Sequence, residues 1–249
     1  MKLLAALSTK RVRRWSDALT DSAIRNGSTI GHASAADYAL IILLAAILGS
    51  NFMMTSVTVA YLPPMLVVTI RLAIATVCLL AVALVAGKAF PRGTIWFPIA
   101  LSAFFGHTLP FALLAWGQQM VDAGVAAIMM ATMPLFTLFL AQVFTDDEKP
   151  NRNAVAGFAL ALGGIVILFG TDKLFSLADQ SVRQYAVACA ALCYGINAII
   201  TKQLTGLPWQ SMSASFMGLA LLFSLPLLLL DDLSAVSGPI HAWTALAYT

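Results

Sequence analysis

Long runs of apolar residues alternate with short polar breaks along most of this 249-residue chain. A helix needs about 20 apolar residues to span a bilayer, and seven runs approach or exceed that length. Six of them contain no Asp, Glu, Lys or Arg, and the seventh contains one arginine, Arg71. Lipid offers no hydrogen bonds to bare backbone, so we predict that all seven are helices. The predicted spans are 38–60, 63–86, 93–121, 123–145, 153–171, 184–201 and 203–230.

The polar breaks between these runs are short, which predicts that consecutive helices lie side by side and antiparallel. Pro63 and Pro64 separate the first two spans, and Asp122 separates the third from the fourth. A further apolar segment begins at His241 and continues to Thr249. We therefore expect an all-α, polytopic membrane helical bundle with seven complete transmembrane helices plus the start of an eighth. We also expect the sequence to be truncated from a longer protein.

The charge pattern predicts how the chain is oriented. Hydrophobic residues make up 60% of the sequence and charged residues only 10%, whereas soluble domains carry about 25% charged residues. With the N-terminus in the cytoplasm, inner segments hold eleven Lys and Arg residues and outer segments hold two. This asymmetry follows the positive-inside rule. We assign residues 1–36 as a basic cytoplasmic tail, and the rest of the chain lacks the basic patch that a nucleic-acid partner would need.

A short pattern recurs in the first and sixth predicted spans. Five helices separate the two copies, so the second copy must cross the membrane in the opposite direction. Inverted-topology repeats of this kind are typical of secondary transporters. A complete second copy would bring the protein to ten helices. The copies are Ala45-x3-Gly49-x-Asn51, followed by Leu-Pro at 62–63, and Ala191-x3-Gly195-x-Asn197, followed by Leu-Pro at 207–208.

Three stretches resemble the EamA-type proteins of the drug/metabolite transporter superfamily. One is LLAAILGSNFMMTSVTVAYLPPMLVVTIRLAIA, with its Gly-Ser-Asn helix, proline turn and arginine in the second helix. Another is AWGQQMVDAGVAAIMMATMPLFTLFLAQVFTDDEKPNRNAVAGFALALGGIVIL, with an internal proline, an acidic turn and a glycine-rich fifth helix. The last is the restart in the sixth span. The sequence departs from the family in lacking the final helices and in reading Thr-Asp-Asp-Glu where Leu-Gly-Glu is common.

The resemblance implies a domain organisation and a function. A first EamA-like repeat would cover 37–171, and an incomplete second repeat would cover 184–249. The family's members are inner-membrane carriers that work by alternating access and move amino acids, other metabolites or drugs, usually outward. The expected partners are a small-molecule solute and the lipid bilayer, with no cofactor. Gly157, Gly163 and Gly164 permit close helix approach, either within the chain or in a homodimer.

Arg71 is the most informative candidate residue. It lies roughly 10 Å below the outer end of the second helix at 1.5 Å per residue, where an unpaired charge costs several kcal/mol. Asn51 lies at a similar depth on the first helix and can accept a hydrogen bond from Arg71. Arg71 either faces an aqueous cavity and attracts an anionic group of the solute, or clamps the first two helices together. The repeat places Phe216 at the matching position, so Asn197 has no arginine counterpart.

Two titratable residues are candidates for proton coupling. His107 lies in the middle of the third span, and an imidazole can carry a proton near physiological pH. Alternatively, His107 is a core histidine bonded to a backbone carbonyl, such as one freed by Pro110. Asp122 lies at the turn between the third and fourth spans, and it can instead cap the helix that follows.

The remaining candidates for the solute cavity are Asn197 in the second copy of the repeat, a proline and two aromatic residues. Pro134 breaks the fourth span near mid-membrane, which suits either a gate or an ordinary kink. Trp116 and Tyr194 can line an aromatic pocket, or they can be packing and interfacial residues.

Three other function classes compete with a carrier. A membrane-embedded enzyme needs His, Cys, Asp or Glu clustered near one interface. The three histidines lie on separate segments, and Cys78, Cys189 and Cys193 lie within apolar runs, so we predict no catalytic residue and no metal. A channel favours polar stripes along several helices, and these are sparse. A non-transporting helical scaffold is the last alternative.

Overall fold

The computed structural model describes residues 35–87, 90–144, 155–157, 159–160, 163, 167, 181–202, 204, 208–231 and 239–249. Six helices within these ranges are long and apolar enough to cross a membrane, and no strand occurs in them. The predicted all-α membrane bundle is thereby confirmed. The tail over 1–34 and most of the predicted fifth span, 153–171, lie outside the described residues.

The chain divides into two compact units, residues 1–47 and 48–249. In the first unit, the structure describes the beginning of helix α3 (Ala35–Val59). Apolar side chains such as Ile41 and Ile42 are more than half exposed there. Exposed apolar side chains suit a lipid environment, in which a helix satisfies its own backbone.

In the second unit, the end of α3 and helix α4 (Pro64–Val85) form the predicted hairpin. Pro63 is the N-cap of α4 and Pro64 occupies its first turn. Proline suits the start of a helix because its missing N–H would have no helical partner there. Arg71 therefore lies two turns into α4, as the sequence predicts.

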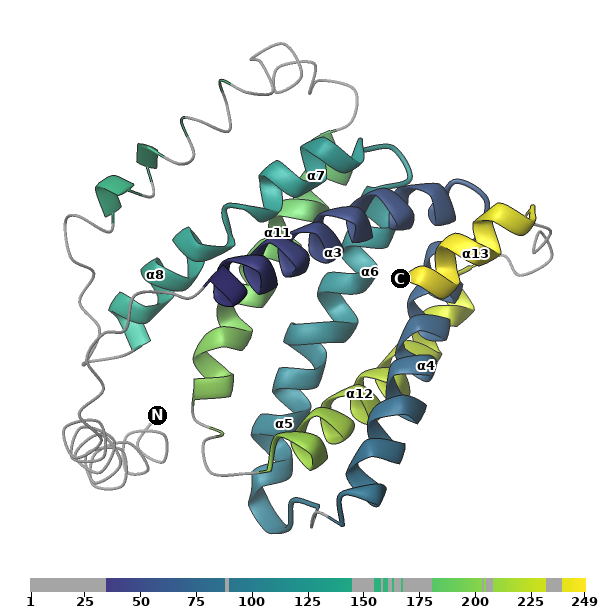
Figure 1. The fold of residues 1–249 in the computed structure, drawn as a ribbon, viewed down its shortest axis with the longest axis vertical. Coiled ribbons are helices and arrows are strands. Elements are labelled where there is room, and N and C mark those ends of the chain that lie inside the picture. The colour runs from purple at the N-terminus through teal and green to yellow at the C-terminus, as the bar shows by residue number, and fades with distance from the viewer. Residues whose placement is uncertain are drawn as a thin grey trace. The chain divides into compact units, whose positions relative to one another are not determined.

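The third span is one continuous rod with a local change of winding. It runs through η1 (Gly93–Ile95), α5 (Trp96–Ala103), η2 (Phe104–Thr108) and α6 (Leu109–Gly117). The η2 segment is a π-helical turn, which holds one more residue than an α-helical turn and often occurs at functional sites. Figure 1 shows this rod between α11 on one side and α4 with α12 on the other.

The fourth span is two helices rather than the single helix predicted over 123–145. Helix α7 (Ala123–Met130) ends, and α8 (Met133–Phe144) begins after a two-residue turn. Pro134 lies in the first turn of α8, where its missing N–H leaves no gap in the helix. The Thr132 hydroxyl donates to the Met129 carbonyl at 2.6 Å, which stabilises one of the last carbonyls of α7.

The later spans are α11 (Ser181–Lys202) and α12 (Trp209–Leu227), the latter extended by the short η4 (Leu228–Leu230). The sequence predicted that the seventh span would start at 203. It starts at Trp209 because Pro208 is held in an extended conformation (φ −58°, ψ 126°) and serves as the N-cap. The expected eighth segment is present as helix α13 (Ile240–Tyr248).

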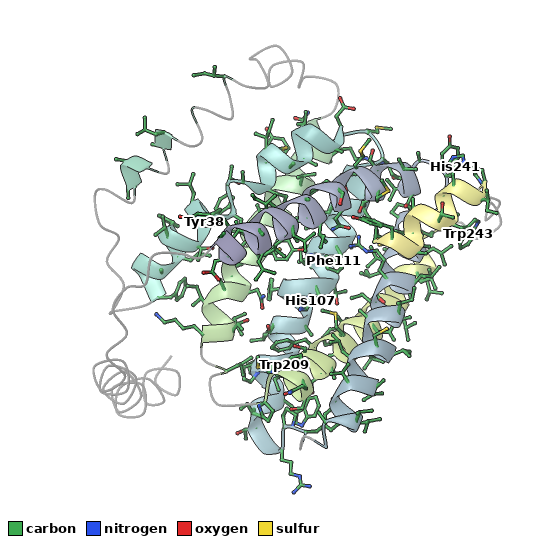
Figure 2. All side chains as sticks on the ribbon, in the orientation of Figure 1. Tyr38, His107, Phe111, Trp209, His241 and Trp243 are labelled. Atoms are coloured by element: carbon green, nitrogen blue, oxygen red, sulfur yellow. The ribbon has the colours of Figure 1, made fainter. Side chains whose placement is uncertain are left out.

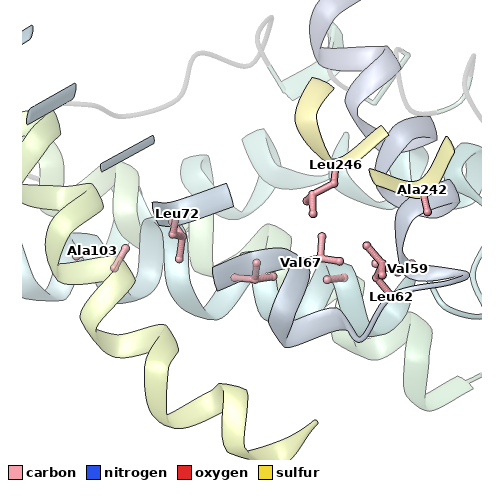
Figure 3. Close-up of a cluster of buried hydrophobic side chains, with 10 residues drawn as sticks. Val59, Leu62, Val67, Leu72, Ala103, Ala242 and Leu246 are labelled. Atoms are coloured by element: carbon pink, nitrogen blue, oxygen red, sulfur yellow. The ribbon is translucent and has the colours of Figure 1, made fainter. Parts of the chain in front are cut away.

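Helices α4 and α12 form the most extensive pairing among the described helices. Figure 3 shows the apolar cluster that they share with the α3–α4 turn, the third span and α13, including Leu62, Val67, Leu72, Ala103 and Leu246. At Gly157 and Gly163, which we expected to support close helix packing, an added Cβ would have no described neighbour within 4 Å beyond the local helix backbone. The close approaches within the described chain occur instead at Gly106, Gly117 and Gly195.

Contacts between helices fix their relative directions within the second unit. The start of α4 meets the end of α12, where the Asp231 carboxylate accepts hydrogen bonds from α4 amides. These two helices are therefore antiparallel. The end of α6 meets the start of α11 at Trp116 and Arg183, and Ser102 of α5 contacts Thr201 near the end of α11. The third span and α11 are therefore antiparallel as well.

Candidate functional site

Arg71 lies at the centre of a polar group formed by α3 and α4. Its guanidinium donates to Asn51 Oδ1 at 3.1 Å and makes a longer contact with Thr55 Oγ1 at 3.4 Å. Thr55 in turn donates to the Asn51 carbonyl at 2.8 Å. The expected contact between Arg71 and Asn51 is thus present, and a neutral amide and a hydroxyl accept from the cation instead of a carboxylate.

An aromatic row continues from Arg71 into the third span. The guanidinium carbon lies 5.2 Å from the centre of the Phe111 ring, within the range of a cation–π contact. Phe111 packs edge-on against His107 at 6.0 Å, and His107 lies 6.1 Å from Phe216 of α12. Figure 2 shows His107 and Phe111 along the same rod. The row therefore links the arginine of α4 to the residue that matches it in the repeat.

His107 is positioned by the π-helical turn, and its environment differs from the hydrogen-bonded core histidine considered above. Within the described chain its imidazole makes no hydrogen bond to a backbone carbonyl and packs between two phenyl rings. The neighbouring Thr108 is the residue that bonds to backbone: its hydroxyl donates to the Ala220 carbonyl of α12 at 3.0 Å. Thr108 is fully buried, whereas His107 is only partly buried.

Tyr194 approaches the group from α11. Tyr194 belongs to the sixth span and lies near the Arg71 guanidinium of the second. Tyr194 is partly buried. The structure therefore gathers Asn51, Arg71, His107 and Tyr194 around one region, from four different spans.

Asn197 forms a second polar cluster near the C-terminal end of α11. Its Oδ1 accepts from Ser102 Oγ at 2.5 Å and from Thr201 Oγ1 at 3.2 Å, and the two hydroxyls lie 3.2 Å apart. Gly106 makes room for the amide, because a Cβ at Gly106 would lie 2.5 Å from Asn197 Nδ2. Asn51 and Asn197 thus match in the repeat but differ in partners: one binds an arginine and the other binds hydroxyls.

Trp116 pairs with Arg183, a residue that the sequence analysis did not single out. The Arg183 guanidinium lies over the indole at 3.8 Å, and it donates to the Trp116 carbonyl at 2.5 Å and to Gln119 Oε1 at 2.8 Å. It therefore satisfies a C-terminal carbonyl of α6. Arg183 and Trp116 are 67 residues apart in the sequence, so spacing alone gave no signal of this contact.

Asp231 is a second functional residue that the sequence analysis missed. Its Oδ2 accepts hydrogen bonds from the amides of Met65 at 2.7 Å and Leu66 at 3.0 Å. These amides belong to the first turn of α4, which has no capping side chain of its own. A residue that follows α12 therefore caps α4, and its charge complements the α4 dipole.

Asp122 does not cap α7 with its side chain, and that part of the prediction is wrong. Its carbonyl accepts from the Ala126 amide at 2.9 Å, so its backbone is the N-cap, but its carboxylate makes no capping bond. The carboxylate is exposed and lines a cavity between α3 and α7. Pro134 is exposed on α8.

No group of three or more His, Cys, Asp or Glu side chains that could hold a metal ion occurs among the residues that the structure describes. The candidate site consists of the Arg71 guanidinium, a permanent cation, surrounded by amide, hydroxyl and aromatic groups. Such a site can bind a polar solute reversibly, which is what a carrier requires. These features define a polytopic helical membrane protein with a polar site inside the bundle.

A family model described as the EamA-like transporter family matches residues 37–170, more than half of the sequence. The chain belongs to this family. It is 27% identical over 164 residues to the uncharacterized transporter YoaV of Bacillus subtilis and 28% identical over 168 residues to protein PagO of Salmonella typhimurium. These alignments cover 65% and 66% of this chain, and 56% and 53% of the relatives.

A relative from Streptantibioticus cattleyicolor carries a more specific description, "Probable terminal-alkyne amino-acid exporter". It is 30% identical over 182 residues, covering 72% of this chain and 59% of that protein. The chain thus spans between half and three fifths of the length of these relatives. A solved crystal structure at 21% identity superposes with a TM-score of 0.59, covering 81% of this chain and 72% of the other, and this likeness concerns the fold.

Proposed function

We propose that the protein is a secondary transporter that moves small organic solutes across the inner membrane by alternating access, with export as the direction. The family resemblance, the exporter description of one relative and the polar site inside the bundle support this proposal. The amino acids, other metabolites and drugs moved by the wider family are the candidate solutes. The family's named relatives are transporters, which argues against the alternative of a membrane-embedded enzyme.

The observation that carries the proposal is the polar group around Arg71. A guanidinium has five N–H donors, and only two hydrogen bonds to described residues use them. No carboxylate pairs with Arg71 in the described chain, so the site keeps a net positive charge in a low-dielectric region. An anionic group of a solute, such as a carboxylate, would be attracted there and could bind to the remaining donors.

The site would lie between two inverted halves, as alternating access requires. The helices that match in the repeat, α4 and α12, run antiparallel and pack along their length. The third span follows α4 after a short loop and is antiparallel to α11, so α11 would run parallel to α4 and opposite to α3. Phe216 and Tyr194 would come from the second half, and Asn51 and Arg71 from the first. This arrangement supports the domains 37–171 and 184–249.

Two polar connections would hold the halves together at the outer end. Arg183, immediately before the second half, binds the end of α6, and Asp231 of the second half binds the start of α4. Near the other end, the halves meet through apolar contacts of Ile99 with Leu204 and Phe216. When the outer end opens, water can replace the hydrogen bonds of Arg183 and Asp231. The apolar contact of Ile99 with Leu204 and Phe216 would separate when the inner end opens and re-form when it closes.

The orientation with the N-terminus in the cytoplasm follows from the basic residues. It places Asp122, Arg183 and Asp231 at the outer surface, and Gly87, Arg92 and Lys202 at the inner surface. Inner segments then carry most of the Lys and Arg residues, as the positive-inside rule requires.

The proposal is tested by counterflow into proteoliposomes that contain the full-length protein. The probe is a panel of labelled amino acids, other carboxylate metabolites and cationic drugs. We expect saturable counterflow of at least one anionic or zwitterionic solute, and a decrease of at least tenfold for Arg71→Ala, since a hydrogen bond to a charged group contributes about 1.5–3 kcal/mol. Arg92→Ala, which changes an exposed arginine at the inner end, is the matched control. An ohmic current, or no flux for the whole panel, would contradict the proposal.

A further inference from the structure

A cavity of about 430 Å³, open to the surface on one side, lies between α3 and α7, away from the Arg71 group. Neither Arg71 nor any of its described partners lines it. The volume falls within the range of small-molecule sites, about 300–1,000 Å³. The lining residues are Met53, Ser56, Val57, Asp122, Ala123, Gly124 and Val125.

Ser56 presents a free hydroxyl to this cavity. Ser and Thr side chains in helices commonly bond to the carbonyl four residues before, and the neighbouring Thr55 and Thr58 do so at 2.8 Å. The carbonyl available to Ser56 is that of Phe52, which already accepts from Gln118 Nε2 at 3.0 Å as well as from the helix. Within the described chain, the Ser56 hydroxyl makes no hydrogen bond.

Asp122 presents a free carboxylate to the same cavity from the α7 side. It does not cap α7, and no Lys or Arg of the described chain forms an ion pair with it. A carboxylate only accepts hydrogen bonds, whereas a hydroxyl can donate or accept. A carboxylate that only accepts and a hydroxyl that can also accept therefore line one cavity.

The remaining walls of the cavity are mainly apolar. Met53, Val57 and Val125 contribute side chains, and Ala123 and Gly124 contribute a narrow, small-residue edge. An anion would be repelled by Asp122, and a fully apolar ligand would displace water from the exposed carboxylate without offering it a hydrogen bond, which is unfavourable.

We propose that this cavity binds a primary ammonium group carried on an apolar body. An ammonium has three donors, which suit the Asp122 carboxylate and the Ser56 hydroxyl together, and its hydrogen bond to the carboxylate is charge-assisted. The apolar body lies against Met53, Val57 and Val125. A quaternary ammonium lacks these donors and binds more weakly.

The proposed orientation places Asp122 at the outer membrane surface, where two sources provide this chemistry. One is a soluble amphipathic amine, and the other is the ethanolamine headgroup of a phospholipid. Both would use the same two polar atoms, so the choice between them is made by experiment.

The first arm uses the full chain in nanodiscs of phosphatidylcholine, whose quaternary headgroup does not donate hydrogen bonds. The probe is hexylammonium, observed by saturation-transfer NMR, with hexanol as a neutral probe of the same length. We expect a saturable hexylammonium signal that Asp122→Asn weakens at least tenfold and Ser56→Ala weakens severalfold. Asp37→Asn, an acid on α3 that does not line the cavity, should leave the affinity unchanged. Matching thermal unfolding of all variants confirms that they fold.

The second arm distinguishes the sources. Nanodiscs that contain phosphatidylethanolamine should lose the hexylammonium signal if the lipid headgroup is the ligand, and native mass spectrometry should then show ethanolamine lipid retained by wild type but not by Asp122→Asn. An unchanged signal identifies the soluble amine. Equal hexylammonium binding by wild type and Asp122→Asn, or equal binding of hexanol, overturns the proposal.

Discussion

Arg71 combines two roles at the residue scale, because the same guanidinium holds Asn51 and keeps donors unused. A lysine would keep the charge but lose the fork of planar donors, and it cannot reach Asn51, Thr55 and a solute in the same geometry.

We predict that Arg71→Lys lowers counterflow at least tenfold, with a change of only a few degrees in the unfolding temperature in detergent. The loss of one charge-assisted hydrogen bond, about 1.5–3 kcal/mol, sets this magnitude. Counterflow and thermal unfolding are measured on the same preparations. Normal counterflow with a large loss of stability would show that Arg71 is only a clamp between α3 and α4.

Gly106 allows the third span to approach Asn197 closely. A Cβ at this position would lie between 2.5 and 2.8 Å from three atoms of the Asn197 amide, and Ser102 of the same span donates a hydrogen bond to that amide. We predict that Gly106→Ala destabilises the protein by about 1–3 kcal/mol through overpacking. The free energy of unfolding in detergent measures the effect.

Gly218→Ala is the matched control for this substitution. Its added Cβ would meet Thr76 Cγ2 at 3.9 Å, an ordinary contact, and alanine favours a helix over glycine. We expect no loss of stability at Gly218. If Gly106→Ala were equally neutral, the close packing of Asn197 against the third span would be refuted.

At the scale of elements, α4 depends on a residue from another helix for its cap. Asp231→Ala removes the acceptor of the Met65 and Leu66 amides, and we predict a loss of about 1–2 kcal/mol, as is typical for a lost cap. Asp231→Asn keeps an oxygen acceptor and should lose less. Thermal unfolding gives the loss, and hydrogen exchange should be faster at these two amides.

Asp122→Ala provides the comparison, since Asp122 also begins a helix but makes no capping bond. Its stability should equal that of the wild type within about 0.5 kcal/mol, the usual range for exposed positions. Equal losses for Asp122→Ala and Asp231→Ala would mean that the Asp231 contact does not stabilise α4.

Hydrophobic run length predicted the helices, but it did not predict their breaks or their long-range partners. The spans around α4 and α11 follow from apolar residues alone. The turn before Met133 and the π-helical turn at His107 depend on how backbone carbonyls are satisfied locally and by neighbouring helices. The sequence predicted that Asn51 and Arg71 lie at a similar depth in the membrane, because a tight turn joins their helices.

The contacts of Arg183 and Asp231 were not predictable in this way. Each joins segments that are far apart in the sequence, 67 residues for Arg183 and Trp116 and 166 for Asp231 and Met65. Both residues lie at ends of spans, where charged side chains are ordinary. Only the packing of α11 and α12 against α4 and α6 brings their partners within reach.

At the scale of the whole molecule, the Arg183 bonds should bias the equilibrium between outer-closed and outer-open states. The accessibility of position 121 can measure this equilibrium, because Val121 is 2% exposed in the structure and packs with Val187 of α11. In a background without native cysteines, we predict that Arg183→Gln makes Val121→Cys react severalfold faster with a membrane-impermeant maleimide. Arg92→Gln should not change the rate. A slower or unchanged rate with Arg183→Gln would contradict a closing role for Arg183.

The proposed inverted halves require that corresponding helices end on opposite faces of the membrane. Ala60 follows α3, and Lys202 is the last residue of α11. Gly87 lies two residues after the end of α4, and Leu230 is the last residue of the α12–η4 helix. All four positions are exposed. As single cysteines in intact cells, Ala60→Cys and Leu230→Cys should react with an impermeant maleimide, whereas Gly87→Cys and Lys202→Cys should react only after permeabilisation. Because each pair of corresponding ends is divided between the two faces, the result does not depend on which face is cytoplasmic. Reaction of Ala60→Cys and Lys202→Cys from the same face would rule out the inverted arrangement, and with it the placement of the Arg71 site between two halves.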